Sequence, residues 1–211
     1  MHKIISLCKN FIYFFRQSEY EHYKQKKCRK LKQTDFTIIS SGCSGTIMYC
    51  DLGLPYLSPT INLAIEMKDF IKMVENLKWY MTGEIIELKK DTAYPVGPLR
   101  DIELHFMHYR SFEEAVSKWE ERKKRINWDK IFIVGNAWNG DLEVLKRFDH
   151  LPYKNKVVFT PINHPEIPSA LFIKGFEKTG KIGILTDYKN QLFKRRYLDA
   201  FDYVSFLNNG Q

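Results

Sequence analysis

From residue 36 onward, short apolar segments of strand-forming residues alternate with segments whose apolar residues recur at helical spacing. The strand-like segments are FTIIS (36–40), DIELHFMHY (101–109), KIFIV (130–134) and KVVFT (156–160). The helix-like segments are SGTIMYCDLG (44–53), KDFIKMVENLKWYM (68–81), SFEEAVSKWEERKKRI (111–126) and DLEVLKRF (141–148). Interleaving of this kind is typical of helices that cover a sheet. The sequence therefore predicts a single layered α/β domain over residues 34–211, with a mixed β-sheet flanked by helices.

The carboxyl-terminal third predicts three further elements. ALFIKG (170–175) and KIGILTDY (181–188) resemble two paired strands around a turn at Thr179-Gly180, and NQLFKRRYLDAF (190–201) resembles a last helix. The intervening GFEKTGK has the spacing of a phosphate-binding P-loop, but Ile182 stands where a Ser or Thr must hold Mg²⁺. We therefore exclude a P-loop.

Almost all of the net charge of +8 belongs to the first 33 residues. They contain nine Lys/Arg and two Glu, whereas the remainder contains 24 basic and 23 acidic residues. A balanced body argues against a nucleic-acid partner. Residues 1–33 predict a basic, amphipathic helical segment with an apolar stripe at Ile4, Leu7/Cys8, Phe11 and Phe14/Phe15. This segment could lie on an anionic membrane surface or pack on its own domain.

The four cysteines indicate reduced thiols. Cys8, Cys28, Cys43 and Cys50 form no CxxC pair and have no zinc-type spacing, so we expect neither a metal site nor a cofactor. No secretory signal is recognisable at the start, and the apolar run there is too short to span a membrane. We expect a cytoplasmic protein, with a possible peripheral location at the inner face of the cell membrane.

Cys43 is the candidate nucleophile. The pattern FTIIS–SGCSG–TIMY places this thiol between a strand and a helix, where free N–H groups and the helix dipole favour a thiolate of lowered pKa. Gly42 and Gly45 permit the turn, and amides of this loop could hold an oxyanion. The alternative is that Cys43 is a small buried residue after a strand.

A thiol nucleophile requires a base, and two histidines are candidates. His108 ends the apolar face of the strand 101–109, and His105 shares the opposite face with Asp101 and Glu103, either of which could orient it. Because residues three apart on a strand point to opposite faces, a zinc site that uses both histidines is not expected.

The body resembles a family of bacterial proteins of unknown function that are generally labelled exopolysaccharide biosynthesis proteins and are often encoded among capsule or lipopolysaccharide genes. The similarity runs from about Thr37 to Leu207 and includes IISxxCxG (38–45), LPYxSP (54–59), YPxG (94–97), DIELHFMHY (101–109), KWxxRxxRIN (118–127) and FDYVxFLN (201–208). The resemblance implies an α/β fold and a role in surface-polysaccharide assembly. The expected substrate-binding residues are Gly42, Gly45, Tyr49, Tyr56 and Ser58, which lie within or beside these motifs. Where members often carry Asn-Asn-Cys-Trp, this chain has Ser41-Gly42-Cys43-Ser44.

The order of the motifs is also similar to that of papain-like cysteine peptidase domains. There a cysteine heads a helix and a histidine follows on a strand, which implies Cys43 as nucleophile and His108 as base. Tyr109 stands where those domains more often place an acid.

Three functions remain open. The first is an enzyme of acyl-type transfer or hydrolysis that acts on a polysaccharide or a lipid-linked sugar precursor. The second is a glycosyltransferase, although no Asp-x-Asp occurs in the chain. The third is a non-catalytic accessory protein that binds glycan or a synthase through Trp119, Trp128, Trp138, Arg122 and Arg125. The alternative for Trp119, Arg122 and Arg125, which lie in the predicted helix 111–126, is that this helix packs its apolar face on the core and exposes its charges to solvent.

Overall fold

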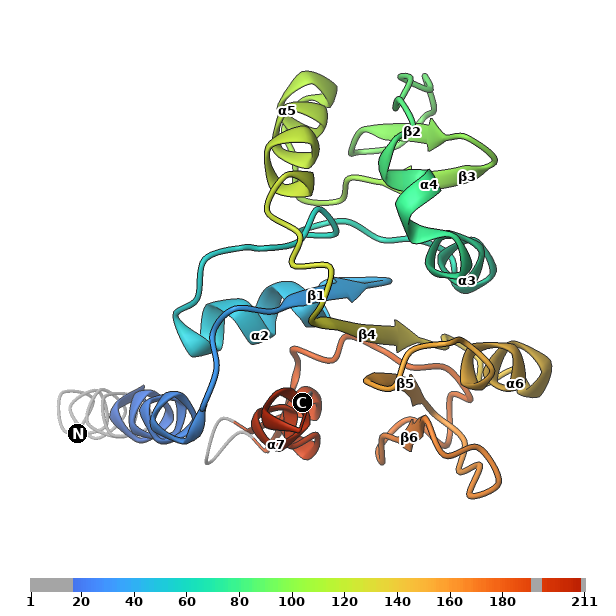
Figure 1. Ribbon diagram of the computed structural model, residues 1–211. Coiled ribbons are helices and arrows are strands. Elements are labelled where there is room, and N and C mark those ends of the chain that lie inside the picture. Colours follow the sequence, from blue (N-terminus) through green and yellow to red (C-terminus); the bar gives the residue numbers. More distant parts are fainter. Residues whose placement is uncertain (1–16, 191–194, 210–211) are drawn as a thin grey trace, which may run out of the picture.

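A four-stranded parallel sheet forms the centre of the protein in a computed structural model that describes residues 17–190 and 195–209 (Figure 1). Its strands, in spatial order, are β1 (Thr37–Ser40), β4 (Ile131–Asn136), β5 (Lys156–Thr160) and β6 (Ala170–Phe172). Strands β1, β4 and β5 are short, mostly buried and rich in β-branched or aromatic residues, as expected for strands covered on both faces, whereas the three residues of β6 are half-buried.

Alternation along the strands divides the core into two parts. Ile38 pairs with Phe132 and both point to one face, whereas Ile39 pairs with Ile133 and both point to the other. All four side chains are fully buried. The sheet therefore requires helical cover on both sides.

Helices supply this cover in two sets. The helices are α2 (Ser44–Leu52), α3 (Met67–Glu75), α4 (Leu77–Met81), α5 (Phe112–Lys123), α6 (Leu142–Asp149) and α7 (Tyr203–Asn208). Helices α3 and α6 pack on the face of Ile39, and α2 and α7 pack on the face of Ile38. The α/β fold predicted from the sequence is confirmed.

Antiparallel pairing occurs outside the parallel sheet. Strands β2 (Val96–Leu99) and β3 (Ile102–His105) form one two-stranded sheet, which lies with α5 above the parallel sheet in Figure 1. Strands β7 (Tyr188–Asn190) and β8 (Arg195–Arg196) form the other. The chain thus combines parallel and antiparallel pairing, as predicted, but in separate sheets.

Two predicted elements are wrong. Residues 181–187 form no strand, because Ile182 and Leu185 bury their side chains from a loop and the Ile182 N–H donates to the Trp138 carbonyl. Strand β6 therefore pairs with β5 instead of forming a hairpin. The described part of the predicted helix 190–201 contains β8 and a 3₁₀ turn, η1 (Tyr197–Ala200). The predicted strand 101–109 also stops at His105, and residues 107–108 form a turn.

The described part of the amino-terminal segment is a helix over residues 17–30 that packs on the carboxyl-terminal elements. Lys27 Nζ lies 3.0 Å from Asp199 Oδ1, and Asn208 donates to the Lys30 carbonyl at 2.9 Å. The predicted apolar stripe at residues 4–15 lies outside the described residues. No helix among those that the structure describes is long and apolar enough to cross a membrane.

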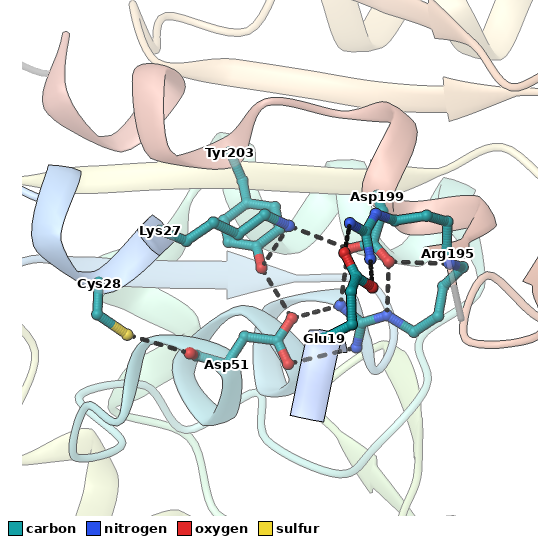
Figure 2. A network of polar contacts seen from close by, with 8 residues as sticks. Glu19, Lys27, Cys28, Asp51, Arg195, Asp199 and Tyr203 are labelled. Carbon is teal, nitrogen blue, oxygen red and sulfur yellow. Dashed lines mark hydrogen bonds and ion pairs between the residues drawn. The ribbon is translucent and has the colours of Figure 1, made fainter. Parts of the chain in front are cut away.

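A buried polar network joins this helix to α2 (Figure 2). Arg196 donates to Asp51, near the end of α2, and to Asp199 Oδ1 at 3.0 Å, while the Tyr203 hydroxyl donates to Asp51 Oδ2 at 2.7 Å. Burial alone would raise the pKa of the Asp199 carboxyl, but hydrogen bonds and charge from Arg196, with the charge of Lys27, outweigh burial and lower it. These charges are therefore paired, as buried charges must be.

Candidate functional site

A cavity of about 730 Å³ lies at the carboxyl ends of β1 and β4. Segments from distant parts of the sequence form its walls, namely residues 41–44, 64–68, 105–108, 136–144 and 183–186. In open α/β sheets, ligands bind beyond the carboxyl ends of the strands. The volume is within the usual range for small-molecule sites.

Cys43 lies in this cavity at the start of α2. It is the N-cap residue, with φ −70° and ψ −4°, and the helix begins at Ser44. The position predicted from the sequence, between β1 and a helix, is confirmed. Cys43 is half-buried and lines the cavity from the start of a helix.

Ser40 organises the turn that carries Cys43. Its hydroxyl donates to the Gly42 carbonyl at 2.8 Å and accepts the N–H groups of Gly42 and Gly45 at 3.4 and 3.3 Å. These two amides of the loop are therefore engaged. The N–H groups of Cys43 and Ser44 make no hydrogen bond to any described residue, so they are the available donors.

Gly42 and Gly45 differ in their surroundings. Gly42 lines the cavity, and a Cβ added to it would meet nothing within 4 Å. A Cβ on Gly45 would lie 2.9 Å from Ser40 Cβ and 3.2 Å from Ile38 Cγ2. Gly45 thus allows α2 to approach β1 closely and does not line the cavity.

Burial raises the pKa of the Cys43 thiol. This direction is opposite to the lowered pKa that the sequence pattern predicts, and it corrects that expectation. At neutral pH Cys43 is therefore a thiol, which a neighbouring base must deprotonate during any attack.

Both candidate histidines line the same cavity as Cys43. The prediction that they point to opposite faces of a strand fails, because β3 ends at His105 and the chain turns before His108. His105 Nε2 lies 2.9 Å from Glu103 Oε1, and Lys90 in turn pairs with Glu103. His108 is exposed, and its side chain has no hydrogen-bond partner among the described residues. No hydrogen bond joins either histidine to Cys43 there.

Asp101, the other predicted orienting carboxylate, lies away from the cavity. Its side chain is exposed, accepts from the Tyr80 hydroxyl at 2.6 Å and pairs with Lys72 at 3.5 Å. The Tyr80 hydrogen bond is the main reason that the pKa of Asp101 is lowered. The carboxylate that contacts His105 is Glu103, two residues along the same strand.

Three residues expected to bind substrate have other contacts. Tyr49 is fully buried, and its hydroxyl donates to the Phe36 carbonyl at 3.0 Å and accepts from the Ile38 N–H at 3.0 Å. Ser58 is buried and its hydroxyl lies 3.0 Å from that of Thr60. The Tyr56 hydroxyl lies 2.9 Å from Cys50 Sγ, and this contact raises the pKa of Tyr56 to about 12. None of the three lines the cavity.

The proposed aromatic and basic binding surface is not continuous. Trp119 is buried in the core, and Arg122 donates to the buried Tyr109 hydroxyl at 2.6 Å. Trp128 lies beside Lys78, whereas Trp138 lies at the cavity. Amphipathic packing therefore describes this part of α5, and Trp138 belongs to a different site.

Several cavity residues were missed from the sequence. Asn136 is the last residue of β4, Trp138, Asn139 and Asp141 follow it, and Glu66 and Lys68 lie at the start of α3. The rule that ligands bind beyond the carboxyl ends of parallel strands could have selected GNAWNGD (135–141) once KIFIV was assigned to a parallel strand. Asn136 Oδ1 is buried and has no hydrogen-bond partner in the described chain.

The described residues contain no group of three or more His, Cys, Asp or Glu side chains that could hold a metal ion. The charged side chains that line the cavity are Lys68, Glu66 and Asp141. The cavity thus combines a thiol, two imidazoles and a few hydrogen-bonding groups with a mostly apolar wall. This arrangement suits nucleophilic or acid–base chemistry on an uncharged group.

Fold and cavity together define an α/β protein with a cavity at the carboxyl edge of a parallel sheet. Residues 14–208 match the domain of unknown function DUF1919, and the chain belongs to this family. It is also similar to an uncharacterised protein of Haemophilus influenzae, with 40% identity over 182 residues that cover 86% of this chain and 88% of the relative.

Proposed function

We propose that the protein is an enzyme of acyl-type transfer or hydrolysis in surface-polysaccharide biosynthesis. The observation that carries the chemistry is that Cys43, His105 and His108 line one cavity. The polysaccharide substrate rests on the motifs that resemble exopolysaccharide biosynthesis proteins. We propose in addition that the enzyme is cytoplasmic and that its substrate is a polysaccharide or a lipid-linked sugar precursor.

In the proposed reaction, Cys43 Sγ attacks the carbonyl carbon of an acyl group while a histidine takes the thiol proton. The carbonyl electron pair moves to oxygen, near the free N–H groups of Cys43 and Ser44. Collapse breaks the bond to the leaving alcohol or amine, which receives the proton from the histidine. The resulting thioester on Cys43 is then attacked by water or a sugar hydroxyl, whose proton returns through the histidine to the sulfur.

The contact with Glu103 favours His105 as the base. A histidine whose ring is held by a carboxylate has a fixed orientation, and catalytic histidines are commonly arranged in this way. His108, which the sequence pattern favoured, is exposed at the same cavity without such a partner. Variants of both residues therefore belong in the test.

A glycosyltransferase that uses a nucleotide-sugar is less well supported by the site. Its diphosphate would meet one lysine and two carboxylates among the charged residues of the cavity. Phosphate groups are normally bound by clustered cations or backbone amides.

The test is complementation of a deletion strain, followed by NMR of its isolated polysaccharide. We expect wild type and Cys50→Ala, a control at an exposed thiol of the same helix, to restore the native acyl pattern. Cys43→Ala should not restore it although its thermal melt is cooperative. Full complementation by folded Cys43→Ala would reject the thiol mechanism.

We also propose that the amino-terminal segment attaches the enzyme to an anionic membrane surface. In the described helix 17–30, Lys27 is engaged with the body, but Lys26, Arg29 and Lys30 are exposed, as is Lys32 just beyond its end. The pKa of the Asp202 carboxyl is lowered mainly by its hydrogen bonds with Ser205, and the charges of Lys30 and Lys27 lower it further. Basic residues beside a membrane contribute about 1 kcal/mol each to its binding.

A further inference from the structure

Trp138 is an exposed aromatic side chain at the mouth of the cavity. Its side chain is 59% exposed, and Ile184, from another wall of the cavity, is 64% exposed. The two loops are joined, because the Trp138 carbonyl accepts the Ile182 N–H at 2.8 Å. A large aromatic ring held open to solvent beside a cavity with convergent polar groups indicates a ligand-binding position.

The loop that carries Trp138 is held firmly. The Ala137 N–H donates to the Phe159 carbonyl at 2.9 Å, and the Gly140 N–H donates to the Ala137 carbonyl at 3.2 Å. Gly140 has φ +64°, and a Cβ there would lie 2.9 Å from Thr160 Oγ1. The indole is thus presented by a backbone that needs no ordering when a ligand binds.

Polar groups of mixed character line the cavity together with Trp138. Beside Trp138, Asn139 and Asp141 use one side-chain oxygen each in bonds to backbone N–H groups, and their remaining amide and carboxylate atoms make no bond to a described residue. The Lys68 ammonium group is likewise without a partner in the described chain. Sugar hydroxyls both donate and accept, so they match a set that contains an amide, a carboxylate and an ammonium group.

The charged and polar side chains of the cavity favour a sugar over a phosphate-bearing ligand or a bare acyl chain. A phosphate-bearing ligand would meet two carboxylates and one lysine, and a bare acyl chain would leave the polar groups without partners. A pyranose has an apolar C–H face, which suits the negative face of an indole, and hydroxyls at its edge.

We propose that Trp138 is the stacking platform of a sugar subsite, on which an uncharged sugar ring of the polysaccharide rests while its acyl group faces Cys43. This deepens the proposed function and depends on it for the acyl group, but not for sugar binding itself. The neighbouring Asn139 and Asp141 bind the hydroxyls at the edge of the ring.

The test uses full-length protein labelled with 5-fluorotryptophan, because the chain contains four tryptophans and each gives its own ¹⁹F signal. Trp138→Phe assigns the signal of Trp138. The probes are N-acetylglucosamine, galactose and maltose, with methyl hexanoate and UDP as competing ligand classes. We expect at least one sugar to shift the Trp138 signal, at concentrations up to ~100 mM because single sugar rings bind weakly.

Variants extend the test. Sugar affinity, measured by isothermal titration calorimetry, should fall about tenfold in Trp138→Ala. It should be largely retained in Trp138→Phe and unchanged in Trp79→Ala, an exposed tryptophan away from the cavity. A Trp138 signal that responds to no sugar, or only to methyl hexanoate or UDP, would overturn the subsite.

Cys43→Ala separates this proposal from the proposed function. Sugar binding at Trp138 in that variant, together with full complementation by it, would retain the subsite and reject the thiol mechanism. Loss of complementation in Cys43→Ala, without any response of the Trp138 signal to sugar, would support the thiol mechanism and reject the sugar subsite.

Discussion

His105 Nε2 lies 2.9 Å from Glu103 Oε1, so a histidine of the cavity wall is held by a carboxylate of its own strand. Residues two apart on a strand share a face, which explains how β3 brings them together. In the proposed mechanism Glu103 fixes the orientation of the His105 ring.

We expect His105→Ala to reduce acyl transfer about 10²–10⁴-fold, the usual effect of losing a general base. Glu103→Gln should reduce it by a smaller factor, because the histidine remains but loses its charged partner. Asp101→Asn is the control, since this carboxylate lies away from the cavity. The measurement is the acyl content of the polysaccharide in complemented strains. A normal product from folded His105→Ala together with a defective His108→Ala would transfer the role of base to His108.

The raised pKa of Cys43 predicts a specific pH dependence. Burial favours the neutral thiol, so the thiolate fraction at pH 7 is below that of an exposed cysteine. The rate of alkylation by iodoacetamide should rise about tenfold per pH unit and continue to rise beyond pH ~8.5, the ordinary thiol pKa. Peptide mapping of a time course at each pH measures it, with exposed Cys50 as the internal reference. A plateau in the Cys43 rate below pH ~8 would show a lowered pKa instead.

The same shift has a consequence for stability. Since the unfolded thiol ionises at a lower pH than the folded one, the unfolded state binds fewer protons between the two pKa values. Stability from this group is therefore lost as the pH rises through that window. Cys43→Ala should reduce the alkaline decline in the urea midpoint relative to wild type.

Gly45 and Gly42 form a matched pair at the turn. Gly45→Ala should lower the free energy of unfolding by about 1–3 kcal/mol, because its Cβ would lie 2.9 Å from Ser40 Cβ. Gly42→Ala should be close to neutral for folding, because nothing lies within 4 Å of the added carbon. Urea denaturation of both variants measures the difference. Equal stabilities would mean that α2 is free to move away from β1.

Arg196 should contribute far more to stability than an exposed arginine. Its side chain is buried between Asp51 and Asp199, so Arg196→Met leaves two carboxylates without their main partner and should cost roughly 3–5 kcal/mol. The control is Arg147→Met, whose exposed pair with Glu75 should cost about 1 kcal/mol or less. Chemical denaturation at neutral pH compares the two. A similar small loss in both variants would contradict a structural role for the buried network.

Binding to anionic vesicles tests the amino-terminal helix without removing it, since truncation would also delete contacts to the body such as Lys27–Asp199. Replacing Lys26, Arg29, Lys30 and Lys32 together by Gln should weaken binding at least tenfold, at about 1 kcal/mol per basic residue. The control replaces Lys174, Lys178, Lys181 and Lys189, which are also exposed. Flotation with vesicles of anionic lipid, repeated at high salt, gives the comparison. Equal, salt-insensitive binding of both variants would reject the membrane proposal.

The sequence by itself determined those strands and turns that depend only on residues close together in the chain. The apolar runs at Phe36 and Ile131 became strands, and the N-cap position of Cys43 followed from a strand, a glycine-flanked turn and a helix. The sequence also predicted which hydrophobic side chains of a strand share a face of the sheet, because side chains alternate between the two faces along a strand.

Tertiary structure decided what those elements bring together. It ended β3 at His105 and turned His108 into the same cavity, and it paired β6 with β5 although a hairpin was predicted. It also raised the pKa of Cys43, since desolvation depends on atoms from distant segments. Trp138 and Cys43 line one cavity because the parallel strands β4 and β1 are neighbours and end at the same edge of the sheet. A periodic pattern in one segment specifies its own faces but not the segment that packs against them.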